Sequence, residues 1–166
     1  DDIFKLIIDE IPEPNADING DLQFQPALLD YNEYVGRIGI GKVHSGTLKV
    51  NEMVSCVRLD GSIKQFRIQK LFGFDGLKRV EINEAKAGDI AAVAGLMDIS
   101  VGETICNVGK EEALPILRID EPTLKMTFMV NNSPFVGKEG SIVTARKIGE
   151  RLFKETQKDV SLKVEE

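Results

Sequence analysis

The chain has 166 residues, of which 42% are hydrophobic and 29% are charged. These fractions are close to the averages of globular proteins and argue against a disordered or fibrous chain. The formal net charge is −6, so the composition as a whole does not indicate a basic nucleic-acid-binding protein.

The first predicted element is a short amphipathic helix over residues 1–11. Its apolar side chains recur at the 3.6-residue helical period: Ile3, Phe4, Ile7, Ile8 and Ile11. Pro12 and Pro14 end the helix, because proline lacks the amide hydrogen that a helix needs. A single helix of this length is marginal by itself, so we expect its apolar side to pack against another part of a longer protein.

The region from residue 20 to residue 110 is predicted to be a β barrel or sandwich, because short strand-like runs alternate with turn sequences. The clearest hairpin joins residues 53–59 to residues 62–70, since Asp60-Gly61 supplies the positive φ of a tight turn. Within residues 35–43, Gly39 and Gly41 lie on one face of the predicted strand. Glycines on one face let a strand bend sharply, as a small barrel requires.

After a connector over residues 111–119, the pattern changes to strand, helix and strand. Residues 123–130 alternate apolar and polar side chains, as a strand with one buried face does. A helix is predicted from the N-cap Ser141 to about Lys158, and residues 160–164 alternate again. This order is typical of the first half of a split β-α-β domain.

The residues that bind metals or perform nucleophilic catalysis are few. Cys56 and Cys106 are 50 positions apart and neither belongs to a Cys-x-x-Cys pair, whereas structural zinc needs four ligands. We expect both cysteines to be reduced and packed in strands. His44 has no nucleophile with an orienting acid beside it and is expected to be exposed near a turn. The sequence therefore predicts no catalytic residue and no metal site.

One stretch looks like a phosphate-binding loop. Residues 36–42 match its G-x-x-x-x-G-K pattern. Val43 stands where such a loop carries the Ser or Thr hydroxyl that binds magnesium, and the stretch has the pattern of a strand rather than of a strand-to-helix joint. We interpret it as a glycine-bent barrel strand that binds no nucleotide.

Five stretches together carry a family resemblance. Residues 36–50 are similar to the opening of the second domain of translational GTPases, and residues 87–96 and 102–105 to the end of the same barrel. Two further stretches, residues 71–80 and 120–140, resemble the TypA/BipA branch of ribosome-associated GTPases. The resemblance runs along the whole chain and is least distinctive in the linker.

The resemblance implies a mainly β fold, in which a translation-factor-type β barrel precedes a partial ferredoxin-like α+β segment. Its layout is a final helix of the GTPase domain (1–14), a linker (15–19), the barrel (20–110), a connector (111–119) and the first half of the third domain (120–166). In this family GTP and magnesium are held by the GTPase domain, whose motifs have no counterpart here. We therefore expect no cofactor and no catalysis within this chain.

The resemblance also implies a cytoplasmic protein that binds the ribosome, both its rRNA and a small-subunit protein, without a membrane partner. Such proteins act in large-subunit assembly and in growth under stress and cold. The barrel loop that touches rRNA in relatives corresponds to the segment that holds Tyr34 and Arg37, whose side chains suit RNA bases and backbone. Lys78 and Arg79 follow a turn and are further candidates, with a solvated hairpin end as the alternative.

Two other interpretations and two further partners follow from the same residues. The chain could be the same region of another translational GTPase, such as the translocation elongation factor. A flavin-binding oxidoreductase barrel is less favoured, because neither Tyr31 nor Tyr34 has the Arg two positions earlier that such barrels usually carry. The GTPase domain of the intact protein is one expected partner. A second copy of the chain is another, because the third domain is half complete and unpaired strand edges recruit a second chain.

Overall fold

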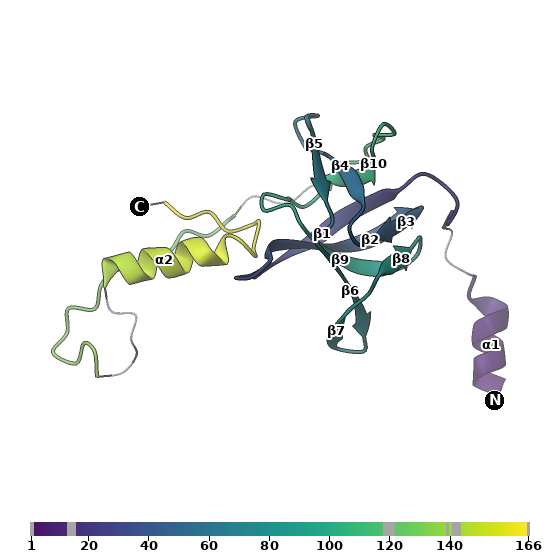
Figure 1. The fold of residues 1–166 in the computed structure, drawn as a ribbon. Coiled ribbons are helices and arrows are strands. Elements are labelled where there is room, and N and C mark those ends of the chain that lie inside the picture. Colours follow the sequence, from purple (N-terminus) through teal and green to yellow (C-terminus); the bar gives the residue numbers. More distant parts are fainter. Residues whose placement is uncertain (1, 13–15, 118–121, 139, 141–143, 166) are drawn as a thin grey trace.

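The computed structural model describes residues 2–12, 16–117, 122–138, 140 and 144–165. Over these residues the fold is mainly β, as predicted, with one helix near each end (Figure 1). The helices are α1 (Asp2–Glu10) and α2 (Ala145–Glu155). The strands are β1 (Gln23–Asn32), β2 (Gly36–Ser45), β3 (Thr47–Lys49), β4 (Met53–Val57), β5 (Ile63–Arg67), β6 (Lys70–Asp75), β7 (Lys78–Glu81), β8 (Glu84–Lys86), β9 (Ile90–Ala94) and β10 (Thr104–Asn107).

Eight strands form one sheet in the order β5-β4-β10-β1-β2-β9-β6-β7, and β3 pairs with β8 in a second, smaller sheet. β5 is at one edge of the large sheet and β6 is next to the other edge, although only Ile68 and Gln69 separate them in the chain. The amide of Ile68 donates to the carbonyl of Glu52 at 3.0 Å, and the amide of Gln69 donates to the carbonyl of Ala94 at 2.8 Å. These two residues connect the two ends of the sheet, which curls into a barrel-like form.

The core fills the inside of this curled sheet. Its largest side chains are less than 2% exposed and come from strands far apart in the sequence, among them Phe24, Val43, Val54, Leu71 and Ile105. Burial of each such side chain stabilises the fold by about 1.5–3 kcal/mol relative to leaving it in water. The apolar positions of residues 20–110 therefore supply the core that the alternating pattern predicts.

The glycine-bent strand is confirmed, because the stretch that looks like a phosphate-binding loop is part of β2. A Cβ atom at Gly41 would stand 1.9 Å from the carbonyl oxygen of Gln25, and one at Gly39 would stand 2.9 Å from Ile99 Cδ1. The register between β1 and β2 also shifts between Pro26 and Leu28, as at a β-bulge. At this point the two strands approach so closely that only glycine fits.

Two smaller predictions about the barrel are also confirmed. β4 and β5 pair antiparallel as the expected hairpin, and Gly61 in its turn has a φ of 80°. Cys56 in β4 and Cys106 in β10 are buried free thiols. The Asp60-Gly61 dipeptide and the wide separation of the two cysteines were therefore sufficient signals.

The C-terminal segment differs from its prediction. α2 begins at Ala145 with Thr144 as its N-cap, whereas the predicted N-cap Ser141 lies outside the described residues. The strands predicted over residues 123–130 and 160–164 are wrong, because neither range forms a strand. Neither range has a hydrogen-bonded strand neighbour among the described residues. Without hydrogen-bonding neighbours, alternating sequences have no sheet to join.

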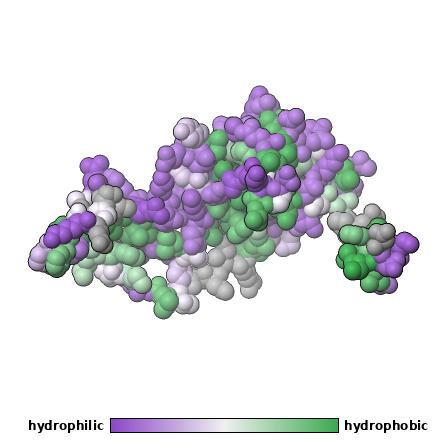
Figure 2. Space-filling view, turned by 90° about the horizontal axis from the view of Figure 1, so that it is seen from below, coloured by the Kyte–Doolittle hydropathy of each residue, from purple (hydrophilic) through white to green (hydrophobic). Residues whose placement is uncertain are grey.

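Helix α1 makes no buried contact with the barrel, and it stands apart from the sheet (Figure 1). Figure 2 shows its apolar side chains at the surface, with Ile3 and Ile8 at 72% and 77% exposure, and Ile11 directly after the helix is 63% exposed. The linker that follows is attached to the barrel at Asp17, whose carbonyl accepts from the amide of Gly46 at 2.8 Å. Residues 13–15 of the predicted helix end and linker lie outside the described residues.

Candidate nucleic-acid interface

Tyr34 lies at the tip of the hairpin between β1 and β2. Its amide donates to Oδ1 of Asn32 at 2.8 Å, and Gly36 completes the turn with a φ of 75°. A side chain that accepts a bond from the backbone two residues later fixes such a tip locally. The tyrosine side chain is 96% exposed, so its ring is available to stack on a ligand.

The hairpin tip borders an open pocket of about 320 Å³ between β1, β2, β6 and β7. Its lining combines aromatic, apolar and charged side chains: Asn32, Tyr34, Val35, Ile38, Lys70, Phe72, Arg79 and Glu81. The guanidinium of Arg79 lies 5.8 Å from the centre of the Phe72 ring, and Lys70 forms an ion pair with Glu81. An exposed aromatic ring beside a cation suits a base and its phosphate.

Two of the four predicted residues come together here and two do not. Tyr34 and Arg79 both line the pocket, whereas Arg37 and Lys78 do not. Lys78 is exposed at the start of β7, beside the fully exposed Leu77 in the hairpin turn. Lys78 is therefore open to a partner, but it lies outside the pocket.

The guanidinium of Arg37 has partners within the chain instead. Nη1 donates to the carbonyl of Ile99 at 3.1 Å, and Nη2 donates to Oε1 of Gln157 at 3.0 Å. Its Nε is buried and has no hydrogen-bond partner among the described residues. These bonds join β2 to the loop before β10 and to the segment after α2, so Arg37 contributes to the structure as well as to the local charge.

Two carboxylates balance the cations around the hairpin. Oδ2 of Asp30 accepts from Nη2 of Arg79 at 2.8 Å, and its Oδ1 lies 3.7 Å from Nζ of Lys158. Partial burial raises the pKa of Asp30, but the bonds from Arg79 and the Tyr31 amide, together with the nearby cations, hold it below its ordinary value. The Glu33 carboxylate pairs with Lys154, which lowers the pKa of Glu33.

Sequence reasoning missed Lys70 and Phe72 in the pocket and the two lysines at the end of α2. A helix was predicted in this region, but nothing in the sequence indicated that its end would meet the β1–β2 hairpin. The pairing of β6 with β9, which brings Phe72 opposite Ala92, was also invisible. These contacts depend on tertiary structure, so local patterns do not contain them.

Nothing in the described residues supports a catalytic or metal centre. Within those ranges, no group of three or more His, Cys, Asp or Glu side chains is placed to hold a metal ion. Burial raises the pKa of Cys56 and Cys106, and the Glu103 carboxylate raises that of Cys56 further. Both thiols are therefore protonated near neutral pH and are unsuited to act as nucleophiles. His44 is exposed in β2, as expected.

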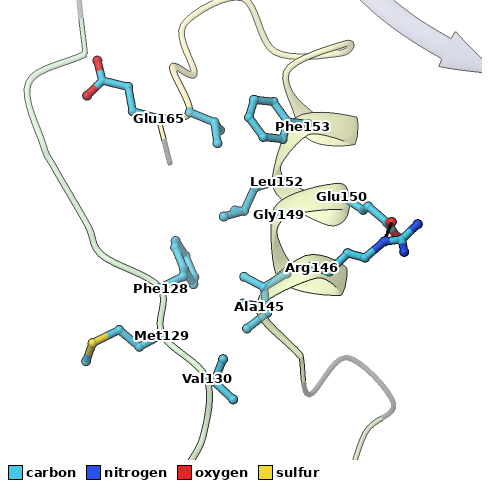
Figure 3. A pocket seen from close by; sticks show the side chains of 12 residues that line it. Phe128, Met129, Val130, Ala145, Arg146, Gly149, Glu150, Leu152, Phe153 and Glu165 are labelled. Atoms are coloured by element: carbon cyan, nitrogen blue, oxygen red, sulfur yellow. Dashed lines mark hydrogen bonds and ion pairs between the residues drawn. The ribbon is translucent and has the colours of Figure 1, made fainter.

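A larger pocket of about 980 Å³ lies between α2 and the preceding extended segment (Figure 3). The side chains of Phe128, Val130, Leu152 and Phe153 extend toward it. No residue of α2 is buried, so this apolar groove is uncovered within the part of the chain that the structure describes.

Known proteins resemble this chain at two levels, in the class of its barrel domain and in its protein family. Residues 36–106 match the family model of elongation factor Tu domain 2, which identifies the curled sheet as a barrel of the translation-factor type. The chain is 62% identical, over 98% of its length, to a Bacillus subtilis (strain 168) protein named large ribosomal subunit assembly factor BipA. Proteins of that name from Synechocystis sp. and Escherichia coli (strain K12) are 47% and 44% identical over 99% of the chain.

The chain belongs to the TypA/BipA family. It spans 27% of the length of the Bacillus subtilis relative, 28% of the Synechocystis relative and 27% of the Escherichia coli relative. No helix in the described ranges is both long enough and apolar enough to cross a membrane.

Proposed function

We propose that this chain is the ribosome-docking part of a TypA/BipA family protein and that its β1–β2 hairpin contacts ribosomal RNA. The observation that carries the proposal is the 96% exposed ring of Tyr34 at the rim of a pocket that also holds Arg79. Tyrosine stacks on unpaired bases and arginine pairs with phosphate or base edges, which is how proteins recognise exposed RNA. The small-subunit contact, through rRNA and protein, belongs to the same proposal.

The activity of the whole protein is part of the proposal. Its relatives are named large ribosomal subunit assembly factors, which supports a ribosome-associated translational GTPase in the cytoplasm that acts in assembly and in growth under stress. GTP and magnesium would be held by residues outside residues 1–166. Similarity along nearly the whole of this chain to proteins named BipA favours this branch over the translocation elongation factor. Self-association and the domain boundaries stay predictions of the sequence.

Replacing Tyr34 by alanine is expected to weaken RNA binding without unfolding the chain, because the ring is almost fully exposed. Loss of one base–aromatic stack costs about 1–3 kcal/mol, which corresponds to roughly 5- to 150-fold weaker binding. Fluorescence anisotropy with a labelled RNA stem-loop measures the affinity. Tyr34→Phe keeps the ring and should bind like the wild type. Equal affinities for Tyr34→Ala and the wild type would contradict the proposed site.

The chain is expected to bind no GTP, because residues 36–42 lie in a strand and Val43 lacks the magnesium-binding hydroxyl. A titration with a fluorescent GTP analogue and magnesium should show no saturable signal. Nucleotide binding with a micromolar dissociation constant that disappears with EDTA would show that the chain carries a nucleotide site of its own.

A further inference from the structure

We propose that the C-terminal end of α2 and the turn after it belong to the same RNA-binding surface, with Lys154 and Lys158 as additional phosphate contacts beside Tyr34 and Arg79. This inference rests on the proposed function and adds contacts from the segment that follows the barrel. The partner chemistry is the RNA phosphate backbone, which lysine binds as a compact positive charge.

The contacts between α2 and the hairpin support this placement. Nζ of Lys154 donates to Glu33, the residue directly before Tyr34. Nζ of Lys158 lies 3.7 Å from Asp30, and Gln157 accepts from Arg37 at 3.0 Å. Lys154 is in the last turn of α2, and Gln157 and Lys158 lie in the turn that follows the helix. The side chains of all three reach residues of the β1–β2 hairpin.

The two lysines remain available to an anion although each has a carboxylate near it. Their side chains are 45% and 46% exposed, and the Glu33 side chain is 71% exposed. Ion pairs between such exposed groups contribute little stability and are screened by salt. An RNA phosphate can therefore replace a carboxylate partner at low cost.

The local charge also favours an anionic partner, in contrast to the net charge of −6 for the whole chain. Four cations lie around the hairpin with two carboxylates. Arg79 and Lys158 lie beside Asp30, and Lys154 pairs with Glu33. Arg37 donates to uncharged groups. Together these groups leave an excess of two positive charges at the side of the molecule that carries the exposed tyrosine. Asp30 and Glu33 hold the lysines near the hairpin before RNA binds, so they act as positioning residues.

The test compares two double variants that remove the same charge. Lys154→Gln/Lys158→Gln removes the proposed contacts, and Lys64→Gln/Lys110→Gln removes two lysines that are also ion-paired, with Asp98 and Asp21. Affinity for the labelled RNA stem-loop is measured by anisotropy over a series of potassium chloride concentrations. Each lost phosphate contact reduces the slope of log affinity against log salt by about 0.7–0.9.

The first variant is expected to lose about 1.5 from this slope, while the control keeps the wild-type slope. Equal slopes for the two double variants would overturn the inference. If Tyr34→Ala weakens binding while Lys154→Gln/Lys158→Gln keeps the wild-type slope, the inference fails and the proposed function stands. If the wild type itself shows no saturable RNA binding, both fail. Circular dichroism of each variant checks that α2 and the barrel are retained.

Discussion

Replacing Gly41 by alanine is expected to lower the free energy of unfolding by about 3 kcal/mol or more, because it overpacks a point with no room. The added Cβ would lie 1.9 Å from the carbonyl oxygen of Gln25 and 2.8 Å from Pro26 Cα, both backbone atoms. Gln25 cannot move away freely, since its Nε2 donates to the carbonyls of Gly102 at 3.2 Å and Pro115 at 2.9 Å. Urea denaturation followed by circular dichroism measures the change.

Gly73 provides the matched control, because it is also a strand glycine without a positive φ. A Cβ at Gly73 would meet Ile82 Cδ1 at 3.2 Å, the end of a flexible side chain that can adjust. Gly73→Ala should change the stability by at most about 1 kcal/mol, in part through a less flexible unfolded chain. Similar losses for the two variants would mean that β1 and β2 do not approach as closely as the structure has them.

The barrel could be predicted largely from local sequence, because its strands end at residues with special backbone requirements. Asp60-Gly61 indicated the β4–β5 hairpin, and Gly39 and Gly41 indicated the bent strand. The alternation of apolar residues indicated which faces are buried. Each signal depends on nearby residues, so it is readable without knowledge of the fold.

Closure of the sheet could not be predicted in this way. The residues that connect its two ends, Ile68 and Gln69, have no sequence signature, and their partners Glu52 and Ala94 are distant in the chain. The opposite error occurred at residues 123–130, where strong alternation predicted a strand that does not form. A strand is stable only with a neighbour, and alternation does not report whether that neighbour is present.

In the candidate site too, features that depend on local sequence were predicted and contacts between distant residues were not. Tyr34 was predicted from the family resemblance, because its segment corresponds to the barrel loop that touches rRNA in relatives, and the structure places it at the tip of a hairpin. That Arg79 would line the same pocket depends on the pairing of β6 with both β7 and β9. The bond of Arg37 to Gln157 joins residues 120 positions apart. Side-chain partners at such separations are set by packing. The sequence therefore indicated the positive charge of Arg37 but not the residue to which it donates.

Replacing Arg58 by alanine is expected to cost about 3 kcal/mol, because removing one partner of a buried ion pair leaves the other charge without compensation. The Glu103 side chain is 3% exposed, and its Oε1 lies 3.4 Å from Nη1 of Arg58. Nη2 of Arg58 also pairs with Asp98 at 2.6 Å. Arg58 therefore holds the loop between β9 and β10 against β4, and the variant should also lose hydrogen-exchange protection at Ser100, whose amide donates to Glu103 at 2.9 Å.

Lys64→Ala is the control for Arg58→Ala, because it also removes a positive charge that pairs with Asp98. The side chains of Lys64 and Asp98 are about half exposed, at 51% and 52%, so the comparison separates the effect of burial from that of charge. An exposed pair contributes about 0–1 kcal/mol, so this variant should remain near wild-type stability in the same urea titration. The double variant Arg58→Met/Glu103→Met removes both buried charges and should recover part of the loss, since apolar replacement of a buried pair is often neutral or better. If Arg58→Ala is as mild as Lys64→Ala, the carboxylate of Glu103 is adequately stabilised by Ser100 and Cys56 alone, and the ion pair is not what holds the loop in place.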